Sequence, residues 1–272
     1  DTPAPEPPSP AVASATTAPT RPKRAYNVVL ITVDTLRPDL GFMNYGKPTS
    51  PNLDKLAEKS TVFENAYSMA SYTGKSVGPM LIGKYPSETV TDFSHFNTYA
   101  SAHTFVAERA KEAGYRTFAG MCHWYFKRSS GLAQGFEVWD TSAIPPGMGD
   151  NDTSITSERM ADLALKLLAQ PENTLGVPAG VDDADAGTAS PSPSVDAQAD
   201  VDGGADAKAG SEGDAGAEEK RPHRFFAWFH FFDPHAQYVP HEGAPDFRDK
   251  GPFATQRALY DQEVWYTDKH IG

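Results

Sequence analysis

Four polar side chains of this sequence stand at the ends of segments with regular patterns. Asp34 ends the apolar run 28–33, and Thr73 opens a segment with a helical pattern. His123 and His235 each follow a further apolar run. A carboxylate can bind a hard cation, a hydroxyl that loses its proton can act as a nucleophile, and an imidazole can transfer protons. Taken singly, each has a simpler alternative, with Asp34 as a turn residue and each histidine as a surface or hydrogen-bonding residue.

Thr73 stands where a helix is predicted to begin. A helix N-terminus offers N–H groups and a partial positive charge to an anion. Together with a metal ion held by Asp34, the Thr73 hydroxyl would suit attack on a phosphate or sulfate ester. The alternative is an ordinary N-cap threonine, whose hydroxyl accepts a hydrogen bond from the helix backbone.

Strand and helix patterns alternate along the chain, which favours an α/β fold with a mostly parallel sheet and helices on both faces. Such sheets place ligands at the carboxyl ends of their strands, so we expect the four side chains to meet at one edge. The first and last strands are mostly apolar and are predicted to be buried on both faces. The predicted strands are Asn27–Val33, Thr61–Asn65, Arg116–Gly120 and Arg224–Phe231, and the predicted helices are Leu53–Lys59, Gly74–Ile82, Thr104–Ala113, Ser157–Ala169 and Ala258–His270.

Two stretches without aromatic residues cannot bury enough apolar surface to offset their chain entropy. They are a Pro/Ala/Thr-rich leader, 1–24, and an acidic stretch, 171–220, and both are predicted to be disordered. Residues 25–272 then form one domain that the acidic stretch interrupts. Because 171–220 holds twelve acidic residues and two lysines, it carries most of the formal net charge of −12. The near-neutral remainder lacks the basic field of a nucleic-acid-binding protein.

The two ends of the sequence and its cysteine content bear on where the protein is located and on whether its sheet is complete. The single cysteine, Cys122, excludes an internal disulfide, and no apolar run reaches the roughly 18 residues of a membrane span. The leader is typical of the spacer behind an export signal, so we expect an exported protein of the periplasm or cell envelope. The final helix runs to Gly272 without a return strand. We therefore expect a sheet that is incomplete at the C-terminus, belonging to the N-terminal part of a longer protein.

An ordered set of motifs in residues 26–272 resembles the sulfatase family, within the alkaline phosphatase superfamily. The segment N-V-V-L-I-T-V-D-T-L-R-P-D resembles the opening metal-binding strand of that family. The other landmarks follow in order: S-P-N-L-D-K-L-A at 50–57, F-E-N-A-Y at 63–67, G-K-Y-P at 83–86, G-Y-R-T at 114–117, Q-G-F at 134–136, H-F-F-D-P-H-A-Q-Y at 230–238 and Y-D-Q-E-V-W-Y-T-D-K-H-I-G at 260–272. Each motif alone is weakly specific, and the ordered set is strong.

The resemblance implies an alkaline-phosphatase-like fold, a divalent cation (Ca, Mg, Mn or Zn) and hydrolysis of sulfate or phosphate esters. Asp34 matches the first metal ligand of the family, and His235 matches the substrate-contacting histidine of its P-H segment. His123 matches the histidine of the family's G-K-W-H segment, which reads G-M-C-H here. Met121 replaces the lysine of that segment, so one contact to a sulfate oxygen is lost.

The main departure from the family lies at the nucleophile. The family pattern C-x-P-x-R, whose cysteine becomes formylglycine, reads T-G-K-S-V here and begins at Thr73. A threonine cannot become formylglycine, and Cys122 lies elsewhere. Related phosphoethanolamine and phosphoglycerol transferases of the superfamily use a threonine at this place, which implies a phosphoryl-enzyme on Thr73 and a place for Thr73 in the metal site. Lys75 either supplies the positive charge of the missing arginine or points to solvent.

Two functions follow for the whole protein. The first is a metal-dependent hydrolase or phosphotransferase of sulfate or phosphate esters, with Asp34 on the cation, Thr73 as nucleophile, and His123 and His235 on the ester oxygens. The second is a catalytically silent sulfatase-like binding module of the envelope. The altered nucleophile segment and Met121 favour the silent module, as does the lack of the family's later metal ligands, an Asp followed by His or Asn. The substrate and the oligomeric state stay open.

Overall fold

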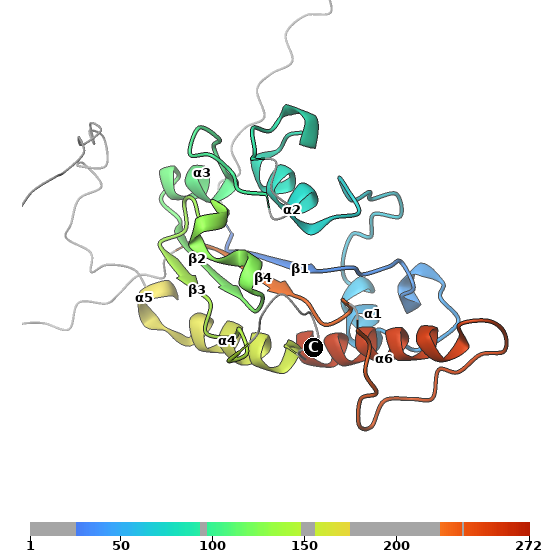
Figure 1. The fold of residues 1–272 in the computed structure, drawn as a ribbon. Helices are drawn as coiled ribbons and strands as arrows, with labels where there is room; N and C mark the ends of the chain where they lie inside the picture. Colours follow the sequence, from blue (N-terminus) through green and yellow to red (C-terminus); the bar gives the residue numbers. More distant parts are fainter. Residues whose placement is uncertain (1–25, 93–96, 148–155, 175–223, 236) are drawn as a thin grey trace, which may run out of the picture.

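A four-stranded parallel sheet forms the centre of the computed structural model, which describes residues 26–92, 97–147, 156–174, 224–235 and 237–272. The strand order is β1-β4-β2-β3, and each neighbouring pair is parallel (Figure 1). This confirms the predicted α/β fold. The strands are β1 (Val28–Val33), β2 (Arg116–Met121), β3 (Val138–Asp140) and β4 (Phe225–Phe231). The leader 1–24 and most of the acidic stretch lie outside the described residues.

Helices cover both faces of the sheet, as the alternating pattern predicts (Figure 1). On one face, Val77 and Leu81 of α2 pack in a core cluster with Phe226 and Trp228 of β4. On the other face, α4 packs with the alternate residues of β4 through Met160, Leu163 and Leu167. The helices are α1 (Pro51–Ala57), α2 (Thr73–Ile82), α3 (Val106–Glu112), α4 (Ser157–Ala169), α5 (Pro171–Thr174) and α6 (Ala254–Ile271).

The two apolar strands differ in their burial, although their sequences look alike. All seven residues of β4 are buried, because β4 has a paired strand on each side and a helical layer on each face. By contrast, β1 pairs with β4 alone, and Val28, Val29 and Ile31 are 44–45% exposed. The prediction that the first strand is buried on both faces is therefore wrong, because among the described strands β1 lies at the edge of the sheet.

Three further elements differ from the sequence prediction. Residues 61–65 form no strand, and Phe63 is 76% exposed, because no described strand pairs with this segment. Strand β3 was not predicted, since its three residues are too few to give a pattern. The first four residues of the stretch predicted to be disordered, 171–174, form helix α5.

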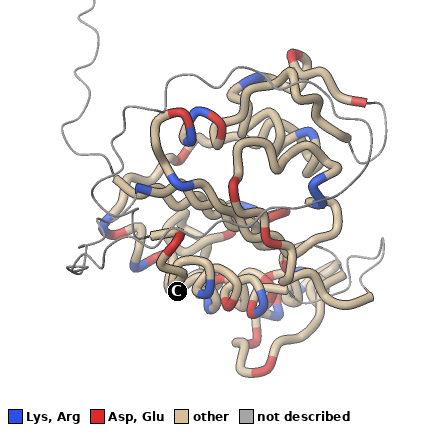
Figure 2. Tube along the Cα trace, turned by 90° about the vertical axis from the view of Figure 1, so that its left-hand side faces the viewer, with Lys and Arg blue, Asp and Glu red and all other residues tan. Residues whose placement is uncertain are grey.

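Two buried acidic residues of α6, Asp261 and Asp268, bind segments that follow β1 in the sequence. Asp268 accepts hydrogen bonds from the backbone N–H groups of Asn52 (2.9 Å) and Leu53 (2.8 Å), which lie in the first turn of α1. A carboxylate at a helix N-terminus stabilises it by satisfying its N–H groups. Asp261 forms an ion pair with Lys47 at 2.8 Å. Along the described trace, Lys and Arg are interspersed with Asp and Glu (Figure 2).

Candidate functional site

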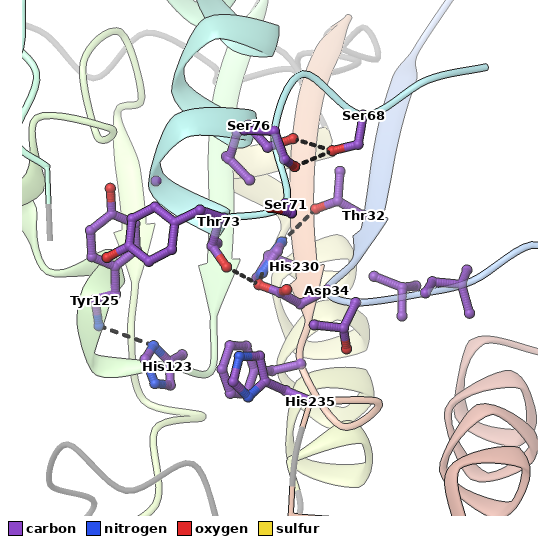
Figure 3. A pocket seen from close by; sticks show the side chains of 18 of the residues that line it. Thr32, Asp34, Ser68, Ser71, Thr73, Ser76, His123, Tyr125, His230 and His235 are labelled. Atoms are coloured by element: carbon purple, nitrogen blue, oxygen red, sulfur yellow. Dashed lines mark hydrogen bonds and ion pairs between the residues drawn. The ribbon is translucent and has the colours of Figure 1, made fainter. Parts of the chain in front are cut away.

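A pocket of about 840 Å³ opens at the carboxyl ends of β1, β2 and β4. Its lining includes all four of the side chains that the sequence analysis singled out, Asp34, Thr73, His123 and His235. Figure 3 shows Thr73 joined to Asp34 by a hydrogen bond, with His123 and His235 below them in the view. The prediction that these four residues meet at one edge of the sheet agrees with this geometry.

Asp34 and Thr73 are joined directly. Asp34 follows β1, and its backbone N–H donates to the carbonyl of Phe231 at 2.9 Å, which extends the pairing with β4 into the pocket. Thr73 is the first residue of α2, and its Oγ1 donates to Asp34 Oδ2 at 2.7 Å. The N-cap of α2 is Tyr72, so Thr73 is not the N-cap residue that the simpler alternative requires.

A third residue, His230, contacts the same carboxylate, and the sequence analysis missed it. His230 Nε2 lies 3.3 Å from Asp34 Oδ2, and its Nδ1 lies 2.7 Å from Thr32 Oγ1. The indole Nε1–H of Trp228 donates to the same Thr32 oxygen at 2.9 Å. The only available signal was one histidine inside the otherwise apolar run F-F-A-W-F-H-F.

The hydrogen-bond partners assign the proton positions of this chain. An ionised carboxylate only accepts hydrogen bonds, so the proton of the neutral His230 ring lies on Nε2 and points at Asp34. Nδ1 then accepts from the Thr32 hydroxyl, whose oxygen in turn accepts from the Trp228 indole, a donor only. Each group has one consistent role, so the chain orients the Asp34 carboxylate through Oδ2, the same oxygen that accepts from Thr73.

The pKa of Asp34 reflects two opposed effects. Burial at 9% exposure raises the pKa of this carboxyl group, because desolvation disfavours the charged form. The hydrogen bonds from His230 and Thr73 outweigh burial and hold the pKa below its ordinary value of 3.8. Asp34 is therefore an anion at neutral pH, as a metal ligand must be.

The lowered pKa predicts how the Asp34→Asn substitution depends on pH in chelator-treated protein. A carboxyl group whose folded-state pKa is depressed contributes stability above its unfolded pKa and loses it as the pH falls. The difference in unfolding free energy between wild type and D34N is expected to be constant near neutral pH and to shrink as the pH falls below 3.8. Urea denaturation at several pH values measures it. A difference that stays unchanged down to the lowered pKa would contradict the assignment.

His123 is held by its neighbours in a defined tautomer. Its Nδ1 accepts from the backbone N–H of Tyr125 at 3.2 Å, so the proton of the neutral ring lies on Nε2. The His123 ring is 4% exposed and stacks on the ring of Phe232, which also lines the pocket. Because its Nε2 carries the proton, His123 can donate a hydrogen bond to an oxygen of a bound ester.

Three other residues from the sequence analysis lie outside the pocket. Lys75 is exposed and lines a smaller cavity of about 360 Å³, which favours the second of its two alternatives, away from the site. Met121, in the place of the family's lysine, is fully buried in the core. Cys122 is buried, and its thiol donates to the carbonyl of His230 at 3.1 Å.

Only part of a metal site is present in the described residues. Asp34 and Thr73 supply two oxygen atoms 2.7 Å apart, a donor set that suits a hard divalent cation. Across the described ranges, no group of three or more His, Cys, Asp or Glu residues is arranged to hold a metal ion. His230 Nε2 is turned to the carboxylate and acts on the site through Asp34. The donor set therefore fits a cation, but it supplies fewer ligands than such an ion takes.

The fold agrees with the comparisons to known proteins. The sulfatase family model matches residues 26–272, so this chain belongs to the sulfatase family, as the motifs predicted. The same fold occurs in two solved structures, a periplasmic domain and a sulfatase. In the part of the chain that the structure describes, no helix is both long and apolar enough to cross a membrane.

Individual relatives resemble the chain over different lengths. Human iduronate 2-sulfatase is 37% identical over 97 residues, which are 35% of this chain and 18% of the relative. The C-terminal periplasmic domain of EcEptC from Escherichia coli, solved in complex with Zn, has a TM-score of 0.54 at 14% identity and covers 91% of this chain. A 2-O GAG sulfatase has a TM-score of 0.57 at 14% identity over the same share. This chain spans 58% and 53% of those two solved chains.

Proposed function

We propose that the whole protein is a metal-dependent hydrolase or phosphotransferase that acts on phosphate or sulfate esters through a covalent intermediate on Thr73. The observation that carries the proposal is the 2.7 Å hydrogen bond from Thr73 Oγ1 to Asp34 Oδ2 at the carboxyl edge of the sheet. A hydroxyl at the first residue of a helix, bonded to a buried anion, is oriented for nucleophilic attack. The sulfatase membership supports an ester of this kind as substrate.

Each step of the proposed reaction is assigned to particular residues of this chain. Asp34 Oδ2 accepts the hydrogen bond that orients the Thr73 hydroxyl, Oγ1 forms a bond to the phosphorus or sulfur atom as the bond from that atom to the ester oxygen breaks, and the hydroxyl proton passes to His235 or water. His235 or water delivers that proton to the leaving oxygen, while His123 donates a hydrogen bond from its Nε2–H to an ester oxygen. His230 holds the carboxylate in place during the transfer. Water or an acceptor alcohol then attacks the Thr73 ester and releases the enzyme.

Asp34 and Thr73 would hold the divalent cation, together with ligands from beyond the described residues. The cation would lower the pKa of the Thr73 hydroxyl and neutralise charge on the ester oxygens. The E. coli domain that shares this fold was solved in complex with Zn, and this supports a cation in a protein of this fold. The identity of the metal is part of the proposal to be tested.

The threonine favours phosphoryl over sulfuryl transfer. A formylglycine sulfatase depends on an aldehyde that threonine cannot form, whereas a threonine hydroxyl can carry a phosphoryl group directly. The 97-residue likeness to iduronate 2-sulfatase supports a sulfate ester as the alternative substrate class. An exported protein of the periplasm or envelope fits both substrates and remains our expectation from the Pro/Ala/Thr-rich leader.

The second candidate is a binding module without catalysis. It is favoured by the incomplete set of metal ligands in the described part of the chain and by the burial of Met121 at the family's lysine position. Such a module would bind a phosphate or sulfate ester in the same pocket and leave it unchanged. The two candidates differ in whether Thr73 is ever modified.

Mass spectrometry of the peptide that contains Thr73 separates the candidates. The full-length protein is loaded with one divalent metal at a time, incubated with an aryl phosphate, a phosphodiester or a sulfate ester, and quenched in acid. A mass increase of one phosphoryl or sulfuryl group at Thr73, absent in Thr73→Ala, supports the enzyme and names the group transferred. An unmodified peptide with every substrate and metal, with no product released, supports the binding module.

A further inference from the structure

Phe232 lies between the two pocket histidines. Its ring centroid is 4.1 Å from that of His123, with an angle of 17° between the planes, and 4.5 Å from that of His235, with an angle of 13°. The side chain is 3% exposed and lines the pocket. These contacts place one aromatic ring against both imidazoles of the site.

The distances indicate that the imidazoles lie on opposite faces of the phenyl ring. Two nearly parallel rings at these centroid distances would overlap each other if they shared one face. His123 comes from the segment after β2 and His235 from the segment after β4, and Figure 3 shows both on the same side of the pocket. The phenyl ring therefore forms a contact between two segments that meet only in the folded protein.

We propose that Phe232 is the positioning residue that fixes His123 and His235 relative to Thr73 and Asp34. The inference rests on the proposed function, because it assigns a role in that same site. A flat ring held in the core restricts rotation of an imidazole stacked on it, and one ring stacked on both sides restricts both together. Phe232 itself has no group that can bond a substrate, so it acts only through the histidines.

The stacking is measured directly by NMR of the full-length protein with labelled histidines, with assignments from single His→Gln variants. The phenyl ring current shifts imidazole protons upfield. In Phe232→Leu, which keeps an apolar side chain without a ring, the His123 and His235 signals are expected to lose this shift, and Phe232→Tyr is expected to restore it. Phe231→Leu is the matched control, since Phe231 is the neighbouring residue and is equally buried at 3%. Unchanged His123 and His235 signals in F232L would overturn the inference.

Kinetics then separate a positioning role from a general loss of packing. In F232L the kcat is expected to fall by up to about 100-fold, as for small displacements of catalytic groups, with a smaller change in KM. F232Y is expected to recover most of the kcat, and F231L to keep it. Wild-type kcat in a folded F232L, or an equal loss in F231L, would overturn the positioning role. If F232L does not fold, Phe232→Met takes its place in both measurements.

The two measurements also keep this inference distinct from the proposed function. A wild-type protein that turns over no ester rejects the proposed function and with it the positioning role, while the NMR shifts still decide whether the three rings are stacked. A wild-type protein that turns over an ester, with no change of His123 or His235 signals in F232L, rejects the role of Phe232 alone.

Discussion

Thr73→Ala is expected to lower the turnover of the full-length protein by about 10⁴- to 10⁶-fold, the range observed when a covalent nucleophile is removed. The substitution removes the one hydroxyl that donates to Asp34 Oδ2 and leaves the rest of α2 in place. Alanine has a high helix propensity, so the helix start is expected to persist. Initial rates with the best substrate of the phosphate and sulfate ester panel, together with the unfolding midpoint, give the result.

Thr73→Ser is the matched variant for this prediction. Serine keeps the hydroxyl and its hydrogen bond to Asp34 while it removes one methyl group. T73S is expected to retain most of the activity and to carry the covalent group at the same position in the mass spectrum. Full activity in T73A would reject Thr73 as the nucleophile and leave the pocket with a different chemistry.

Asp34→Ala is expected to abolish divalent metal binding and, with it, turnover. The substitution removes the buried anion of the site, and the Thr73 hydroxyl alone is a weak ligand for a hard cation. Chelation of wild type is expected to give the same loss of activity, restored by adding back the metal. Calorimetric titration with Ca²⁺, Mg²⁺, Mn²⁺ and Zn²⁺ measures the affinity and identifies the preferred ion.

His230→Gln tests a residue that acts on the proposed metal site only through its contact with Asp34. His230 orients Asp34 without being a proposed ligand, and loss of such a partner usually lowers metal affinity or activity by about 10- to 100-fold. H230Q is therefore expected to fall between wild type and D34A. Metal binding by D34A with wild-type affinity would exclude Asp34 as a ligand, and unaltered binding by H230Q would exclude the orienting role of His230.

The sequence predicts the parts of the site that depend on local signals. Asp34 comes directly after a short apolar run, and Thr73 comes directly before a helix that ends at Gly83. A strand end and a helix start can both be read within about ten residues, and parallel strands carry their ends to one edge. This is enough to predict the place of Asp34 at the edge of the sheet. Thr73 is predicted there from a strand at 61–65 that the structure lacks, so the correct expectation for Thr73 depends on the resemblance to the sulfatase family.

The sequence does not predict the residues whose role depends on distant pairing. Thr32 and His230 are register partners in the β1–β4 pair, so their hydrogen bond exists only because strands almost 200 residues apart align in that register. Within its own run, His230 looks like one polar residue in a buried strand. The prediction of a strand at 61–65 is wrong for the opposite reason. The β-branched and aromatic residues of this segment favour a strand, but no described strand pairs with it.

The open side of β1 also bears on the pocket. Asp34 is the next residue after this strand, and the position of its backbone is set by bonding to β4 on one side only. Among the described residues no strand pairs with the other side of β1, so its N–H and C=O groups that point away from β4 form an edge to which a further strand can add. A strand added at this edge would bond the backbone that leads to Asp34 on its second side.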